Sequence, residues 1–257
     1  MKINLKLIEF LNKKTGEYNH PRFIKDDPIS VPHLFTKKQD IEIAGFFAAI
    51  FSWGNRSTII SKSKELMQRM DNAPNQFITQ YKESDIKKLQ GFRHRTFHYA
   101  DLLYFIEFLS LHYLRNDSLE NAFSAGISKK DKTVEAGLNS FRKYFFIYEH
   151  EKRTGKHIAS PELGSTCKRL NMFLRWMVRR DDKGVDFGIW KNISPSQLIC
   201  PMDVHVARVA KKLGLLKRKQ VDWLAARELT ETLRKLDKDD PVKYDFALFN
   251  LGVIEKF

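Results

Sequence analysis

Apolar residues recur at helical spacing along most of the chain, whereas no stretch alternates regularly between apolar and polar positions. Spacings of three, four and seven residues place side chains on one face of an α-helix, whereas a half-buried strand requires alternation. We therefore predict an all-α fold. The clearest helices are predicted over residues 41–51, 59–70, 102–114, 134–148 and 221–236, with a last one between Pro241 and Val253.

The N-terminal third contains the sharpest contrast in polarity. Residues 41–51 are so uniformly apolar that they predict a central, buried helix, and Thr36-Lys37-Lys38-Gln39 before them has the pattern of a capping box. The first 35 residues are polar and contain the helix breakers Pro21, Pro28 and Pro32. We predict irregular structure for these 35 residues.

The net charge of the chain indicates what kind of partner the protein binds. The chain has 257 residues, enough for one large or two small domains, and 45 Lys and Arg against 31 Asp and Glu give a formal net charge of +14. Such a charge favours a polyanion, either nucleic acid or an anionic membrane. No apolar run approaches the roughly 20 residues that cross a bilayer, and the basic residues are scattered rather than gathered in one amphipathic stretch. We expect no membrane association.

The cysteines and the N-terminus limit the cellular compartments and the cofactors that the sequence is compatible with. Cys167 and Cys200 are too few for a disulfide framework or a four-thiolate iron–sulfur cluster, and the first residues lack the apolar region of a signal peptide. His94 and His98 are four residues apart, but Arg95 stands where a zinc protease motif has glutamate. We expect a cytoplasmic protein with no metal and no cofactor.

Two segments 35 residues apart carry the candidate chemistry. Gly164-Ser165-Thr166-Cys167-Lys168 predicts a loop that opens into a helix with the lysine in its first turn, and Pro201-Met202-Asp203 places an aspartate at the start of another helix. A deprotonated lysine amine can attack C1′ of a deoxynucleoside and displace the base through a Schiff base. The partial positive charge of a helix start and the charge of the neighbouring Arg169 both disfavour the protonated, positively charged form of Lys168. Asp203 could deprotonate the amine or stabilise positive charge on the sugar. Each residue also has an ordinary alternative, a solvated lysine and a helix cap.

The second segment carries a resemblance to a known superfamily. Residues 201–210, PMDVHVARVA, resemble the Pro-Val-Asp-x-His-Val-x-Arg-Val stretch of the helix-hairpin-helix DNA glycosylases, which include endonuclease III and the 8-oxoguanine glycosylases. The resemblance implies a two-lobed helix-hairpin-helix glycosylase fold with the active site between the lobes. It also implies a catalytic role for Asp203. Residues 164–176 match the start of the second hairpin helix, whose lysine is the nucleophile in bifunctional members, and this implies that Lys168 is the nucleophile.

Three further stretches extend the resemblance. Residues 49–56 resemble the loop that fills the gap left by a flipped base. Residues 91–95 resemble the Gly-Tyr-Arg-x-Arg turn of the 8-oxoguanine enzymes, and residues 245–249 resemble the last helix of those enzymes. The implied base-pocket residues are Asp245 and Phe249, although an aromatic ring on a closing helix also suits a core. The implied wedge and DNA-contacting residues are Trp53, Asn55, Arg56, Arg93, Arg95, Gly164, Ser165, Thr166 and His205. Arg175, Arg179 and Arg180 would form either a solvated face or further phosphate contacts.

The chain departs from the superfamily in three respects. Its hairpin has one evident glycine, Gly164, where two are usual. Residues 181–190 lengthen the spacing between the lysine and the aspartate, as in the archaeal 8-oxoguanine glycosylases. The cysteine cluster of endonuclease III is absent. Residues 168–179 and 241–248 also resemble an uncharacterised family of bacterial proteins. The resemblance implies one glycosylase-like unit over 1–257, with one lobe at 40–200 and a second at 1–39 plus 201–257.

The resemblance implies a base-excision repair enzyme. We expect excision of an oxidised purine, 8-oxoguanine first, with AP-lyase activity through a lysine Schiff base. The expected partner is double-stranded DNA containing a damaged base, bound by a monomer in the bacterial cytoplasm in association with the nucleoid. Two alternatives stay open: a glycosylase for another lesion, such as an alkylated base, and a DNA- or lesion-binding protein without catalysis.

Overall fold

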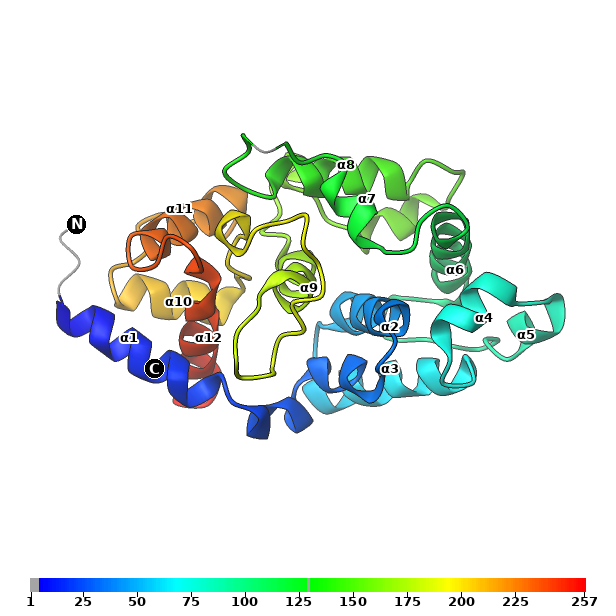
Figure 1. Cartoon of the computed structure of the whole chain (residues 1–257), viewed down its shortest axis with the longest axis horizontal. Helices are drawn as coiled ribbons and strands as arrows, with labels where there is room; N and C mark the ends of the chain where they lie inside the picture. Colours follow the sequence, from blue (N-terminus) through cyan, green and yellow to red (C-terminus); the bar gives the residue numbers. More distant parts are fainter. Residues whose placement is uncertain (1–4, 129) are drawn as a thin grey trace. The chain divides into compact units, whose positions relative to one another are not determined.

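The protein is helical in a computed structural model, which describes residues 5–128 and 130–257 (Figure 1). Among these described residues, the only extended pairing is an isolated bridge between His94 and Phe97. The prediction of an all-α protein is therefore confirmed.

The chain divides into two compact units that interleave in sequence. Unit 1 comprises residues 1–23, 127–139 and 160–257, and unit 2 comprises residues 24–126 and 140–159. These boundaries differ from the predicted lobes, which placed residues 160–200 apart from the C-terminal segment. The physical reason is a set of buried ion pairs, described below, that join residues 175–186 to residues 240–245 within unit 1.

Unit 2 is built around the predicted apolar helix. This helix, α2 (Lys38–Phe51), buries every residue from Ile41 to Phe51. Its aromatic rings pack on other helices of the unit, with the centroid of Phe46 5.8 Å from that of Phe105 and 6.0 Å from that of Phe141. The expected capping box does not form, because the N-cap residue is Lys37 and its side chain makes no capping hydrogen bond. The other helices with residues in this unit are α3 (Arg56–Arg69), α4 (Pro74–Gln80), α5 (Glu83–Lys87), α6 (Tyr99–Tyr113), α7 (Glu120–Ser124) and the end of α8 (Glu135–Phe145).

A buried carboxylate lies within this apolar helix. Glu42 is fully buried, and its oxygens accept hydrogen bonds from Ser118 Oγ at 2.5 Å, Tyr113 Oη at 2.8 Å and the backbone N–H of Leu119 at 3.0 Å. A buried charge is tolerated only when it is satisfied in this way. Glu42 therefore fixes α2 to the end of α6 and to the loop that leads into α7.

Unit 1 contains the segments singled out by the sequence. Its helices are α1 (Leu5–Tyr18), α9 (Lys168–Val178), α10 (Val204–Lys212), α11 (Trp223–Arg234) and α12 (Asp245–Val253), and α8 begins in it. Helix α12 packs against both α1 and α10, which lie beside it in Figure 1. At Gly252 a Cβ atom would lie only 3.1 Å from His205 Cβ, so glycine permits the close approach of α12 to the start of α10.

The prediction of irregular structure for the first 35 residues was wrong for residues 5–34, and residues 1–4 lie outside the described part of the chain. Helix α1 covers Leu5–Tyr18 and buries Leu11, Thr15 and Tyr18, which have the helical spacing of four and three. Its Asn12 Oδ1 accepts a hydrogen bond from Tyr244 Oη at 3.0 Å, next to the start of α12. The prolines begin short 3₁₀ helices at Pro21–Asp26, Pro28–Ser30 and Pro32–Leu34. Packing on α12 therefore stabilises a helix whose own sequence is mostly polar.

We predict that Glu42→Ala destabilises the protein by about 3 kcal/mol or more, because three donors, two of them buried, lose their acceptor. Thermal and urea denaturation measure the loss. Glu107→Ala, at an exposed position of α6, is the matched control and should change stability by less than about 0.5 kcal/mol. Equal, small effects of the two substitutions would contradict the structural role assigned to Glu42.

Candidate active site

Lys168 is the first residue of α9, as the sequence predicted. The residue before it, Cys167, adopts the left-handed conformation, with φ 50° and ψ 31°, and its thiol donates to the carbonyl of Ser165. Ser165 Oγ in turn accepts a hydrogen bond from the Cys167 N–H at 3.1 Å. Asn171 Nδ2 donates to the carbonyl of Thr166 at 3.0 Å. The loop side chains thus hold the helix start, and the lysine is placed by backbone geometry.

Gly164 connects this loop to α11. It ends a short 3₁₀ helix, Pro161–Leu163, with a positive φ of 72°, which favours glycine. Its carbonyl accepts a hydrogen bond from the N–H of Trp223, the first residue of α11. The segment before the lysine helix is therefore a three-residue 3₁₀ turn. Of the predicted DNA-contacting residues, Gly164, Ser165 and Thr166 all lie in this loop.

Asp203 uses its two carboxylate oxygens for two different tasks. Oδ1 accepts hydrogen bonds from the backbone N–H groups of His205 at 2.9 Å and Val206 at 3.0 Å, which makes Asp203 the N-cap of α10. Oδ2 lies 3.2 Å from Nζ of Lys168. Aspartate is among the best N-cap residues, and a helix N-terminus stabilises its negative charge. Capping thus fixes the carboxylate while leaving one oxygen for the amine.

The Lys168–Asp203 pair brings together the two residues that the sequence proposed as nucleophile and assisting acid. Their side chains are 25% and 20% exposed, so the pair is sheltered but reachable from solvent. Nζ of Lys168 also lies 5.3 Å from the centroid of the half-buried Phe249 ring on α12. An amine, a carboxylate and an aromatic face therefore meet in unit 1, carried by α9, the N-cap of α10 and α12.

The environment of Asp203 keeps its carboxyl group ionised. Burial alone would raise its pKa, but the positive charge of Lys168 and the hydrogen bond from the Val206 N–H outweigh that effect, and the net pKa is lower than usual. The proximity of His205 acts in the same direction. His205 itself, a predicted DNA-contacting residue, donates its backbone N–H to Asp203, and no partner of its buried Nδ1 was found in the described chain.

Asp245, which the resemblance placed in the base pocket, is the first residue of α12. Its buried carboxylate binds Nη1 of Arg175 through Oδ2 at 2.5 Å. Burial raises the pKa of Asp245 to about 6, against the opposing charges of Arg175 and Lys168, while Asp203 adds to the rise. The carboxylate of Asp245 therefore holds Arg175, and it lies near enough to Lys168 and Asp203 for their charges to act on its pKa.

Arg175 and Arg179 form neither a solvated face nor a phosphate-binding surface. Both are buried one turn apart on α9 and share the fully buried carboxylate of Asp186, at 3.3 and 3.1 Å. Arg179 also binds Asp240 at 2.8 Å and Asp181 at 2.7 Å. Sequence reasoning missed this network, although two arginines four residues apart followed by aspartates between 181 and 186 were a signal for it.

The predicted wedge residues form their own group in unit 2. The guanidinium of Arg95 lies 4.4 Å from the centroid of the Trp53 ring, and Arg93 Nε donates to the carbonyl of Arg95 at 3.1 Å. Asn55 is the N-cap of α3, which begins at Arg56, and its Oδ1 accepts from the Thr58 N–H. These five residues are thus neighbours within unit 2, and the Asn55 side chain is engaged in capping.

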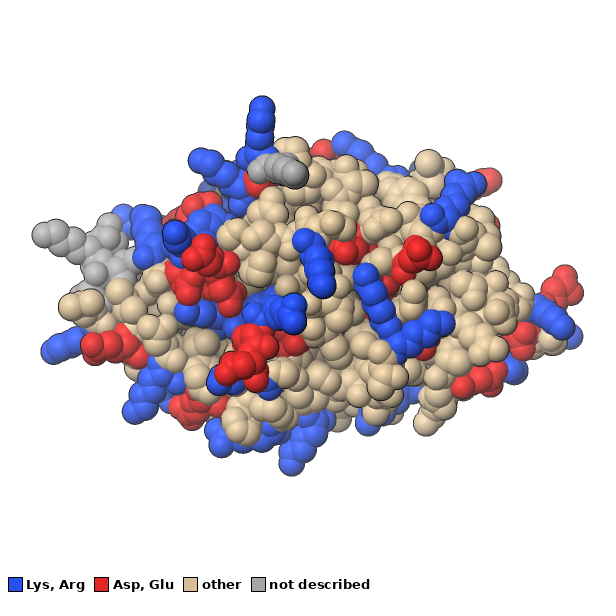
Figure 2. Space-filling view, in the orientation of Figure 1, with Lys and Arg blue, Asp and Glu red and all other residues tan. Residues whose placement is uncertain are grey.

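The surface and the remaining residues add two observations. In the face shown in Figure 2, lysine and arginine side chains are dispersed among acidic ones rather than gathered into one uninterrupted patch. Among the residues described, no group of three or more histidine, cysteine or acidic side chains could hold a metal ion, and no helix is long and apolar enough to span a membrane.

Comparison with known proteins gives a family. A family model described as "Protein of unknown function (DUF2400)" matches residues 27–254, which is well over half of the chain, so the chain belongs to that family. No curated protein and no solved structure gives a significant match.

The raised pKa of Asp245 predicts a specific pH dependence. Between about pH 4, where an unfolded aspartate titrates, and about pH 6, the folded protein holds a proton that the unfolded chain has released. The Asp245 contribution to the free energy of unfolding therefore falls as pH rises through this window. Asp245→Asn removes this contribution. The stability of the variant relative to wild type should accordingly rise between pH 4 and 7, by up to about 3 kcal/mol.

Urea denaturation at several pH values measures this difference. The control is Asp239→Asn, the same substitution at an exposed position close by in the chain. A difference for Asp245→Asn that does not change with pH would show that Asp245 does not titrate in this way.

Proposed function

We propose that the protein is a DNA base-excision repair glycosylase with AP-lyase activity, acting through a Schiff base on Lys168. The observation that carries the proposal is the Lys168–Asp203 pair. An amine and a carboxylate from segments 35 residues apart lie 3.2 Å from each other, each at the start of a helix. The formal net charge of +14 supports a nucleic-acid substrate.

The proposed reaction begins with transfer of a proton from the Lys168 amine to Oδ2 of Asp203, 3.2 Å away. The amine nitrogen then bonds to C1′, and the bond between C1′ and the base nitrogen breaks. The departing base takes up a proton released by the nitrogen now bonded to C1′. The bond between C1′ and O4′ then breaks, O4′ takes the proton held by Asp203, and the opened sugar carries a protonated imine between Nζ and C1′. The freed Asp203 carboxylate removes a C2′ proton, and the electron pair expels the 3′ phosphate by β-elimination, which cleaves the strand.

Phe249 has a supporting role in this proposal. Its ring is half buried, and the Lys168 amine lies 5.3 Å from its centroid, so it can provide an apolar face for an extruded base beside the nucleophile. The ion pair between Asp245 and Arg175 joins the start of α12 to α9. Oxidised purines, 8-oxoguanine first, are the proposed lesions, and double-stranded DNA is the proposed partner.

Borohydride trapping tests the nucleophile. Wild-type protein incubated with a duplex containing one 8-oxoguanine should give a covalent protein–DNA adduct, because hydride adds to the imine and makes it permanent. Lys168→Gln should give no adduct. Lys217→Gln, which removes an exposed lysine of unit 1, is the control and should trap as wild type does.

A trapped product that persists in Lys168→Gln would refute the assignment of the nucleophile. Duplexes with an alkylated base in place of 8-oxoguanine test the choice of lesion. Tight, salt-dependent binding with neither adduct nor base release on any lesion would indicate a binding protein instead of an enzyme.

Asp203→Asn separates the catalytic role of Asp203 from its structural role. Asparagine caps a helix about as well as aspartate, so α10 should stay intact while the negative charge is removed. Single-turnover base release should slow by about 10²-fold or more, the usual scale for loss of a catalytic acid or base. The matched control is Asp222→Asn, because Asp222 is likewise an N-cap, that of α11, and is likewise paired with a cation, Arg218. Equal single-turnover rates for the two variants would count against a catalytic Asp203.

A further inference from the structure

A concave site in unit 1 lies at the end of the lysine helix opposite to Lys168. It is a cavity of about 1010 Å³ whose lining includes Val178, the last residue of α9. Lys168 begins the same helix ten residues earlier, so the two ends are roughly 15 Å apart at 1.5 Å per residue. None of the residues of the Lys168–Asp203 site lines this cavity.

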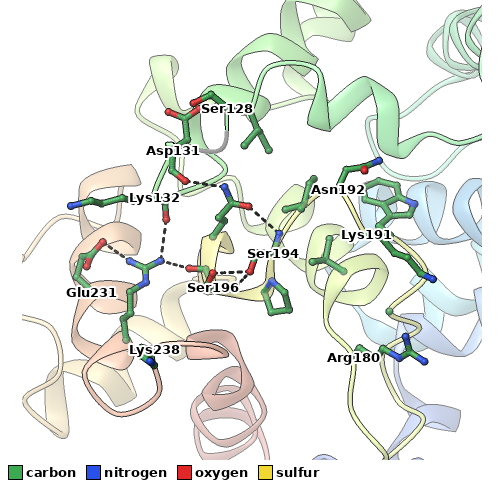
Figure 3. Close-up of a pocket in the computed structure, with 18 residues that line it drawn as sticks. Ser128, Asp131, Lys132, Arg180, Lys191, Asn192, Ser194, Ser196, Glu231 and Lys238 are labelled. Atoms are coloured by element: carbon green, nitrogen blue, oxygen red, sulfur yellow. Dashed lines mark hydrogen bonds and ion pairs between the residues drawn. The ribbon is translucent and has the colours of Figure 1, made fainter.

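Cations dominate the rim of the cavity. Figure 3 shows Lys132 and Lys238 on one side and Arg180 and Lys191 on the other. Lys132, Arg180 and Lys238 are exposed, and among the described residues none of these three forms an ion pair. They therefore present positive charge from both sides of one cavity.

The acidic residues of the lining are already engaged. The Glu231 carboxylate pairs with Arg234 Nη1 at 2.5 Å, and the Asp131 carboxylate accepts the Ser128 N–H at 2.7 Å. Arg234 also donates to the carbonyl of Ser196 at 2.8 Å, so it braces the wall of the cavity. The lining therefore keeps a positive balance, with five lysine and arginine side chains against two carboxylates among its described residues.

The rest of the lining offers hydrogen bonds and no stacking surface. Ser194 and Ser196 place hydroxyl groups between the two cationic sides, where they are hydrogen-bonded to each other at 2.7 Å (Figure 3). Among the described residues of the lining, Trp190 alone is aromatic, and it is 2% exposed and packs edge-on against Phe173. Lysine, arginine and hydroxyl groups bind phosphate, whereas recognition of unpaired bases relies on exposed aromatic faces.

We propose that this cavity binds consecutive phosphates of a DNA backbone, as a second contact separate from the Lys168–Asp203 site. Cations on two sides require a ligand with several negative charges along its length, which a phosphodiester strand supplies. The distance of roughly 15 Å along α9 corresponds to about four base pairs at 3.4 Å each. The proposal rests on the proposed function only in taking DNA as the polyanion.

The test is the salt dependence of binding to an undamaged, fluorescently labelled duplex, followed by anisotropy. The triple variant Lys132→Gln, Arg180→Gln, Lys238→Gln should bind at least about tenfold more weakly at 0.1 M salt. The slope of log K against log salt concentration should become shallower by about 0.9 for each phosphate that the variant no longer neutralises, and so by up to about 2.7.

The control removes the same charge elsewhere in unit 1. Lys13→Gln, Lys219→Gln, Lys235→Gln replaces three exposed lysines that do not line the cavity, and its slope should stay close to that of wild type. Equal slopes for the two triple variants would overturn the proposal. Circular dichroism melts of both variants establish that the comparison is between folded proteins.

Inorganic tripolyphosphate tests whether the ligand is a strand or a small anion. It should compete with the duplex only weakly, because it cannot span the cavity as a strand does. Stoichiometric binding of tripolyphosphate to wild type, abolished in the cavity variant and unaccompanied by a change in duplex affinity, would overturn the assignment to DNA.

The failure of the cavity proposal and the failure of the glycosylase proposal would give different results. Duplex binding needs no imine, so a protein without base-excision activity can still show the slope change. Conversely, the cavity variant retains Lys168 and Asp203 and should still trap on lesion DNA when protein is saturating.

Discussion

The whole candidate site depends on how one carboxylate divides its two oxygens. Asp203 caps α10 through Oδ1 and faces the Lys168 amine through Oδ2. The cap fixes the side chain at a helix N-terminus, where negative charge is stabilised, so the carboxylate is held in place before any substrate arrives. The amine is placed in the same way, by the backbone at the start of α9. Pre-organisation of both groups comes from helix ends and is inseparable from the fold of unit 1.

A network of buried ion pairs supports the placement of Lys168 and Asp203. Arg175 joins α9 to Asp245 at the start of α12, and Arg179 joins it to Asp240, while both arginines share Asp186. Burial of such groups is costly, and their mutual hydrogen bonds are what make it tolerable. The same ion pairs hold residues 181–186 against α9. The segment between Lys168 and Asp203 is thus held in place near the site, and Gly188 and Trp190 further along it line the basic cavity.

Local patterns predicted the site better than they predicted its surroundings. The helix starts at Lys168 and Asp203 follow from capping and from the apolar periodicity behind them, and the structure confirms both. That the two side chains meet is a tertiary fact, which the sequence indicated only through its resemblance to a superfamily. Helix α1 was missed because its stability comes from packing on α12, and the orientation of Asp245 was missed because its partner, Arg175, is 70 residues away in the chain. The cavity rim is likewise assembled from distant segments.

The most direct test of this account is to locate the covalent bond. After borohydride reduction of the complex with 8-oxoguanine DNA, proteolysis and tandem mass spectrometry identify the modified residue. The account predicts a single modified side chain, Lys168, carrying the deoxyribose remnant on Nζ. A remnant on any other amine of the chain, or its absence despite demonstrated base release, would contradict the central claim that this lysine attacks the sugar.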